Sequence, residues 1–80
     1  MSVYVDGPIH PFGRMLMCHM IADTLDELHQ MADKIGVRRK WFQDKARFPH
    51  YDICKLKRSL AVKFGAIETS SRELIKIAEK

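Results

Sequence analysis

A helix-capping signal in the first half of the chain decides how the residues on both sides of it fold. Thr24 is followed three residues later by Glu27, the T-x-x-E pattern in which a hydroxyl and a carboxylate cap the first turn of a helix. Apolar residues then recur at helical spacing as far as Gly36, which is the expected C-terminal stop. This pattern predicts a helix over residues 25–35. The apolar run before it, residues 15–22, is therefore expected to be a strand.

Turn residues and apolar spacing predict the other elements, which are strands at 2–6 and 37–43, a loop at 7–14, a helix at 53–64, an edge strand at 66–69 and a last helix after Ser70. The strand at 15–22, the helix at 25–35 and the strand at 37–43 together make one predicted βαβ unit. Eighty residues are enough for a single domain, 1–80. We expect an α/β fold with a short, largely parallel sheet of three or four strands and three helices.

Composition narrows the class of protein. Apolar residues make up 46% of the chain and charged residues 30%, which is typical of a globular domain, and no apolar run reaches the roughly 20 residues of a membrane span. The first residues, MSVYVDG, have neither the basic start nor the apolar centre of a signal peptide, so we expect a cytoplasmic protein with reduced thiols at Cys18 and Cys54. The small core also favours a homodimer.

Polar residues that follow the predicted strands suggest a binding site. In an open α/β sheet, ligands bind outside the carboxyl ends of the strands, where Asp6 and Asp23 stand in this chain. His19 shares the strand face of Asp23, and His50 and Asp52 come on the loop after the next predicted strand. Imidazole and carboxylate ligands suit zinc, manganese or iron. The sequence therefore predicts a divalent metal site formed by His19, Asp23, His50 and Asp52, with Asp6 beside it.

Three of these residues also have an ordinary structural explanation. His19 lies in an apolar run, where a hydrogen-bonded core histidine is common. Asp23 directly precedes the capping residue of the first predicted helix, and Asp52 has the position of an N-cap for the helix at 53–64. No dense ligand motif such as H-E-x-x-H occurs in the chain, so both explanations stay open.

Basic residues predict a different kind of ligand. The net charge is +4, and the amino ends of helices attract phosphate groups. The stretch VRRKWFQDKARFPHY, residues 37–51, alternates basic residues with Trp41, Phe42, Phe48 and Tyr51, which suits phosphate contacts and base stacking. Arg58 lies within two helical turns of Asp52 and reaches the same site only if the loop folds back. A nucleotide or a nucleic acid is the partner that these features favour.

Six segments carry a resemblance to a known family, namely VYVDG, CHMIADTLDELHQMADKIG, WFQ, PHYDI, KRSLAVKFGA and SRELIKI. In their order and spacing the chain resembles a small family of uncharacterised proteins of bacteria and tailed phages, catalogued as a domain of unknown function. The resemblance covers nearly the whole chain. It implies a bacterial or phage protein of the cytoplasm and brings no established activity with it.

Three functions remain as hypotheses. The first is a small accessory protein that binds a phosphate-bearing ligand at the carboxyl edge of its sheet, with a site made of Asp6, His19, Asp23, His50, Tyr51, Asp52 and Arg58. The second is a metal-dependent phosphoester hydrolase in which the His/Asp cluster holds the ion and a bound water attacks. The third is a phage protein that docks on a host protein without catalysis.

Overall fold

The computed structural model describes residues 2–7, 10–12, 15–44 and 48–79. Its strands are β1 (Val3–Val5), β2 (His10–Phe12), β3 (Met15–Ala22), β4 (Phe42–Gln43), β5 (His50–Cys54) and β6 (Ile67–Glu68). Its α-helices are α1 (Leu25–Ile35), α2 (Lys55–Lys63) and α3 (Ser71–Ala78), and a 3-10 turn, Arg39–Trp41, precedes β4. The chain is therefore an α/β protein with the three helices expected from its sequence.

The sheet has the strand order β4-β5-β3-β1-β6, and β2 also pairs with β3. Among the described residues, four of the five strand pairs are antiparallel, and β1 and β6 alone run parallel. The expected largely parallel sheet is therefore wrong. The physical reason is that β1 and β3 are neighbours joined by a short segment, which reverses the chain and cannot provide the long crossover that parallel strands need.

The expected βαβ unit is not confirmed either. β4 pairs with β5, and β5 stands between β4 and β3 in the strand order. The prediction of three or four strands was too low because β2 lies in a segment predicted as a loop, and β5 lies in one predicted as a loop and a helix start. One of them, β2, contains Pro11 and pairs only with β3 in the described part of the chain, a position where the missing amide hydrogen of proline is tolerated.

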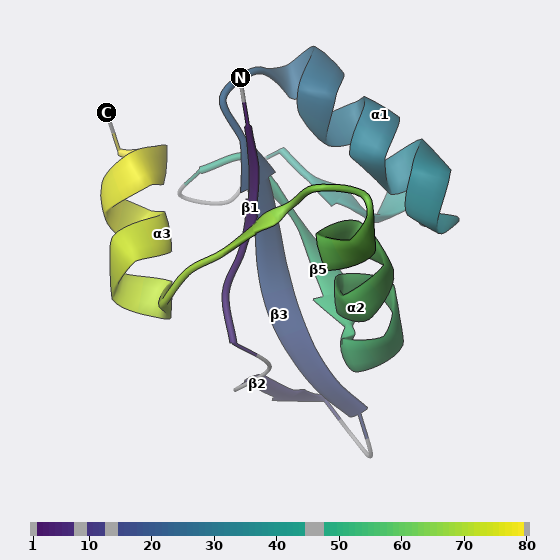
Figure 1. The fold of residues 1–80 in the computed structure, drawn as a ribbon, viewed down its shortest axis with the longest axis horizontal. Helices are drawn as coiled ribbons and strands as arrows, with labels where there is room; N and C mark the ends of the chain where they lie inside the picture. Colours follow the sequence, from purple (N-terminus) through teal and green to yellow (C-terminus); the bar gives the residue numbers. More distant parts are fainter. Residues whose placement is uncertain (1, 8–9, 13–14, 45–47, 80) are drawn as a thin grey trace.

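Helices cover both faces of the sheet, with α1 and α2 on one side and α3 on the other (Figure 1). The face under α1 and α2 carries the larger apolar core, with Val5, Met20 and Tyr51 fully buried against helix residues such as Leu28. Because side chains alternate along a strand, Asp6, His19 and Asp52 belong to the opposite face, the one that α3 partly covers. Polar groups of three strands therefore share the α3 face.

The start of α2 is later than its predicted position. The helix was expected from Ile53 with Asp52 as N-cap, but residues 50–54 form β5, and Cys54 is the N-cap. The reason is that β5 pairs with β3 on one side and with β4 on the other, and these ladders outweigh a local cap. Asp52 is therefore a strand residue whose side chain is available to the α3 face.

The two capping signals predict their helices correctly. The Thr24 hydroxyl accepts from the Glu27 amide at 3.2 Å, and the Ser70 hydroxyl accepts from the Glu73 amide at 3.1 Å. Gly36 ends α1 with φ at +80°, a conformation that favours glycine. Among the described residues, no helix is both long enough and apolar enough to cross a membrane.

Candidate metal centre

A row of polar residues crosses the middle of the sheet on its α3 face. His19 of β3 stands opposite Asp52 of β5 in the strand register, and the Asp6 amide at the end of β1 donates to the His19 carbonyl at 3.2 Å. Directly opposed residues in antiparallel strands place their side chains on the same face. The antiparallel ladders thus bring together residues separated by 13 to 33 positions of sequence.

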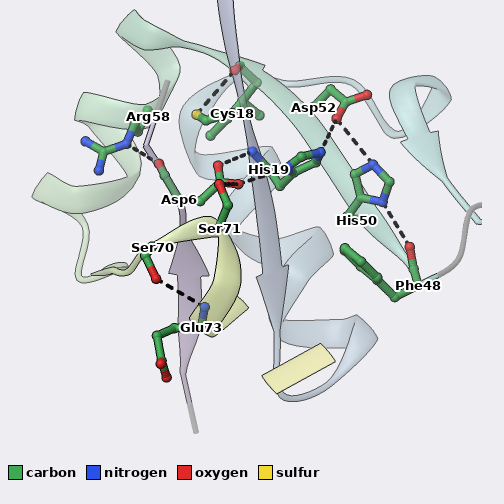
Figure 2. Close-up of polar contacts among 11 residues, drawn as sticks. Asp6, Cys18, His19, Phe48, His50, Asp52, Arg58, Ser70, Ser71 and Glu73 are labelled. Atoms are coloured by element: carbon green, nitrogen blue, oxygen red, sulfur yellow. Dashed lines mark hydrogen bonds and ion pairs between the residues drawn. The ribbon is translucent and has the colours of Figure 1, made fainter. Parts of the chain in front are cut away.

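Asp6 and His19 form the buried part of this row. The Asp6 side chain is fully buried, and its Oδ2 lies 2.7 Å from His19 Nδ1, while Oδ1 accepts from the His19 amide at 2.6 Å. The Ser71 hydroxyl, at the first residue of α3, donates to the same Oδ2 at 3.1 Å. Three donors therefore hold this carboxylate in place, as Figure 2 shows.

These contacts shift both pKa values toward the charged forms. Burial would raise the pKa of Asp6, but the hydrogen bonds from His19 and Ser71, with the charge of His19, bring it below its usual value of 3.8. The hydrogen bond to Asp6 raises the pKa of His19 above 6.5, against the effect of burial, and the nearby negative charges act in the same direction. Asp6 is thus ionised at neutral pH, and an ionised carboxylate only accepts hydrogen bonds. The proton between the two groups belongs to His19 Nδ1.

His50 has the same arrangement with a different acceptor. Its Nδ1 lies 2.9 Å from the Phe48 carbonyl oxygen, which can only accept, so Nδ1 is again the protonated nitrogen. Its Nε2 lies 3.2 Å from Asp52 Oδ1, and His19 Nε2 lies 3.8 Å from the same oxygen. Figure 2 shows both rings turned toward Asp52. The nitrogens that face Asp52 are therefore the ones that carry lone pairs when the rings are neutral.

His19 Nε2, His50 Nε2 and a carboxylate oxygen of Asp52 lie within 4.8 Å of one another. Two imidazole lone pairs and a carboxylate oxygen repel one another unless a proton or a cation lies between them. Ligand atoms stand about 2.0–2.2 Å from a zinc ion, which places them roughly 3.4 Å apart in a tetrahedral site. The two nitrogen-to-oxygen distances, 3.2 and 3.8 Å, bracket this value, and 4.8 Å is the upper limit for the whole set. These three residues, which we call the His/Asp cluster, have the chemistry of a two-histidine, one-carboxylate metal site.

The other residues predicted for the site lie elsewhere. Asp23 is exposed at the far end of β3, where its Oδ2 accepts from the Ser2 amide at 2.8 Å. It is far from Asp6 because β1 and β3 are antiparallel, so their carboxyl ends are at opposite edges of the sheet. Asp6 and Asp23 were predicted to lie together because the carboxyl ends of parallel strands share one edge of a sheet. In this sheet β1 and β3 are antiparallel, so the prediction does not apply to them.

Tyr51 and Arg58 have structural contacts. Tyr51 is buried on the opposite face of β5, where its hydroxyl lies 2.7 Å from His29 Nδ1. Arg58 of α2 donates through Nε to the Asp6 carbonyl at 2.6 Å and through a terminal nitrogen to Glu68 at 3.1 Å. Arg58 therefore supports the backbone of Asp6 and ties α2 to β6.

The stretch proposed for nucleic-acid contacts is only partly described, since Lys45 and Arg47 lie outside the described residues. Trp41 is 56% exposed, and Lys40 Nζ lies 5.2 Å from its ring centre. Phe42 packs against the core, to which Tyr51 also belongs. Trp41 remains available as a stacking group.

The roles that two residues have in this site were not predicted from the sequence. The S-x-x-E pattern indicates a role for Ser70 as the helix cap and none for Ser71. In the structure it is the Ser71 hydroxyl that donates to Asp6. Phe48 acts through its carbonyl oxygen, and a backbone group leaves no signal in a sequence. A strand prediction for residues 50–54 would have found the shared face of His50 and Asp52, because the two are separated by two positions.

Fold and site together define the class: a small α/β protein with a mixed sheet and a His/Asp cluster on one of its faces. The sequence model of the family described as "Protein of unknown function (DUF4031)" matches residues 3–80, and the chain belongs to this family. Neither a curated protein nor a solved structure matches the chain.

Proposed function

We propose that the chain binds one divalent transition-metal ion through its His/Asp cluster and uses the ion to hydrolyse a phosphate ester. The observation that supports this is the orientation of the two imidazoles. Each Nδ1 is held by an acceptor, Asp6 for His19 and the Phe48 carbonyl for His50, so that each Nε2 faces Asp52. Metal-binding histidines are held by such acceptors through the ring nitrogen that does not bind the metal.

The number of ligands favours a catalytic ion. The three ligands found among the described residues would leave at least one coordination position for water, as in catalytic zinc sites and in two-histidine, one-carboxylate iron sites. Asp52 has a side chain that is 43% exposed, so solvent reaches the cluster, whereas His50 is nearly buried and rigidly placed. The protein thus supplies ligands that are held in place and that solvent can reach from one side.

A metal ion would also make phosphate binding at this face favourable. The Asp6 and Asp52 carboxylates alone would repel an anion, and the nearest described cation of the predicted site, Arg58, is engaged with the Asp6 carbonyl and Glu68. A divalent ion offsets these negative charges and gives a phosphate oxygen a ligand position. Phosphate binding at this face is therefore expected to depend on metal.

The reaction is a hydrolysis. His19, His50 and Asp52 would hold the ion, which would lower the pKa of a bound water and so supply the nucleophile at neutral pH. Hydrolysis would join the water oxygen to phosphorus and break one ester P–O bond, and the leaving alcohol would take up the proton that the water lost. The products are inorganic phosphate and an alcohol. Asp6 and Ser71 keep the His19 ring in position throughout.

Calorimetric titration of Zn²⁺ and Mn²⁺ into chelator-treated protein tests the metal site. We expect one ion per chain, and we expect His19→Gln, His50→Gln and Asp52→Asn each to weaken binding by about 10- to 100-fold or more. His29→Gln is the matched control, since His29 lies on the other face of the sheet with Tyr51. The proposal is wrong if no ion binds or if the cluster variants bind as tightly as the control.

Release of inorganic phosphate from phosphate monoesters by the metal-loaded protein tests the catalytic part. We expect turnover that a chelator abolishes and that Asp52→Asn lowers by at least about 100-fold. Stoichiometric metal binding without any turnover would contradict catalysis and leave a binding protein.

The other expectations stay predictions. They are binding of a nucleotide or nucleic acid without hydrolysis, docking on a host protein, a homodimer, an origin in bacteria or phages and a cytoplasmic location. For nucleic acid, the exposed Trp41 beside Lys40 is the feature that favours it, and salt-sensitive binding that weakens on Trp41→Ala would support it.

A further inference from the structure

A pocket of about 440 Å³ lies where β3 leads into α1, and residues at the end of α3 line its other side. Its walls are Tyr4 of β1, Ile21 of β3, Phe48 and Pro49 before β5, and Ala78 at the end of α3. Asp23 and Thr24 add polar groups at one end of it. Its volume is in the range of small-molecule sites, which are mostly apolar with a few polar groups.

The pocket adjoins the His/Asp cluster. Ile21 is the next residue after His19 that faces the α3 side of β3, about 7 Å further along the strand. Phe48 belongs to both places, because its carbonyl oxygen accepts from His50, its ring centre lies 5.3 Å from that of His50, and it lines the pocket. A molecule in the pocket is therefore about 7 Å, two residues along β3, from a group bound at the cluster.

We propose that this pocket binds the base of a nucleoside phosphate whose phosphate group lies at the His/Asp cluster. This inference rests on the proposed hydrolase function and names its substrate class. In a nucleotide, one sugar ring separates the base from the phosphate, and the step from His19 to Ile21 and on toward Asp23 spans about 7–14 Å along β3. The geometry therefore matches a substrate with a flat ring at one end and a phosphate at the other.

The lining of the pocket has the chemistry that bases need. Tyr4 and Phe48 offer aromatic surface, and aromatic side chains are the usual stacking partners of bases. Asp23 offers a carboxylate with several acceptor positions, of which the Ser2 amide occupies one, so it can also accept from an amino or imino group of a base. A sugar phosphate that lacks a base would leave this lining unused.

Binding of nucleosides to chelator-treated protein tests the pocket independently of any metal. We expect calorimetry or ligand-observed NMR to detect at least one of adenosine, guanosine, cytidine and uridine, and to detect no binding of ribose 5-phosphate. Ala78→Phe fills the pocket from α3 and is expected to weaken nucleoside binding by about tenfold or more. Lys76→Phe is the matched control, because Lys76 is exposed on the same helix and does not line the pocket.

A second variant guards against a folding defect in the first. Leu25→Trp narrows the pocket from α1, where Leu25 is 50% exposed, and is expected to weaken nucleoside binding as well. The inference is overturned if no nucleoside binds at millimolar concentration, or if both filling variants bind as the wild type does.

The outcomes separate this inference from the proposed function. Binding of metal by Ala78→Phe is expected to equal that of the wild type, because the pocket contributes no ligand to the cluster. Nucleoside binding without metal binding would support the pocket and overturn the hydrolase. In the metal-loaded protein, a nucleoside monophosphate is expected to have a lower KM than ribose 5-phosphate, and equal values for kcat/KM would overturn the substrate class.

Discussion

Asp6 is the residue on which the geometry of the cluster depends. It is a fully buried carboxylate that accepts from the His19 ring, the His19 amide and the Ser71 hydroxyl, and its own carbonyl accepts from Arg58. A buried carboxylate is unfavourable unless such donors surround it. These contacts fix the tautomer of His19 and turn its Nε2 toward Asp52. Asp6 thus acts on the candidate metal site through His19.

Replacing Asp6 by asparagine tests this dependence. Asp6→Asn keeps the size of the side chain and removes its charge, so the pKa of His19 is expected to fall from its raised value. We also expect a loss of about 1–3 kcal/mol in the free energy of unfolding, since buried donors lose a charged acceptor. NMR titration of the histidine ring protons measures the pKa. Asp33→Asn, at an exposed aspartate paired with Arg39, is the control, and an unchanged His19 pKa in Asp6→Asn would contradict the assignment.

The same pair predicts how stability depends on pH. The folded state raises the pKa of His19 above 6.5, so its protonation stabilises the protein fully below pH 6.5, and this contribution is lost as the pH rises through the folded value. The folded state lowers the pKa of Asp6 below 3.8, so its contribution is present above pH 3.8 and is lost as the pH falls through the folded value. The pair therefore stabilises the chain most between pH 3.8 and 6.5.

Urea unfolding of chelator-treated protein across pH 5–9 checks this dependence. The difference in unfolding free energy between the wild type and His19→Gln is expected to shrink as the pH rises above 6.5. A difference that stays constant over the whole range would show that protonation of His19 does not contribute to folding.

At the scale of the elements, helix starts that depend on local signals could be predicted from the sequence, whereas a strand that depends on long-range pairing could not. The caps at Thr24 and Ser70 placed the starts of α1 and α3 because capping depends on residues three positions apart. The segment His50–Cys54 was predicted as a loop and a helix start because its strand character comes from pairing with β3 and β4, which are distant in sequence. Asp52 was named as a candidate ligand for the wrong reason, since it lies on a strand and not on the loop expected there.

The cap of α3 gives a prediction at the scale of one element. Ser70→Ala removes the acceptor for the Glu73 amide and is expected to cost about 1 kcal/mol of stability, with faster amide exchange in the first turn of α3. Because Ser71 in that turn donates to Asp6, fraying of the turn is also expected to shift the His19 ring resonances. Ser59→Ala, on the exposed side of α2, is the control and should change neither. A stability equal to that of the wild type would mean that packing alone holds α3.

At the scale of the whole molecule, the antiparallel pairing of β3 with β5 brings the residues of the candidate site together. His19, His50 and Asp52 come from β3 and β5, and the register of these two strands decides whether the ligand atoms meet. A register shift of one residue would send His19 or Asp52 to the opposite face, where Tyr51 and Met20 lie. Sequence alone could name the ligand types and could not give this register, because several antiparallel alignments suit the same apolar pattern.

Because the candidate ligands belong to two strands that meet only in the folded chain, metal binding is expected to stabilise the fold. An ion that binds only the folded state adds about 2.7 kcal/mol when its concentration is 100 times its Kd. For a domain of 80 residues this corresponds to a rise in Tm of roughly 10–20 °C. Calorimetric unfolding with and without Zn²⁺ or Mn²⁺ measures the rise, which should vanish in Asp52→Asn and persist in Asp33→Asn. An equal rise in Tm in both variants would place the ion away from the His/Asp cluster. A rise that is lost only in Asp52→Asn would show that the ion stabilises the fold through the three side chains that the pairing of β3 with β5 brings together.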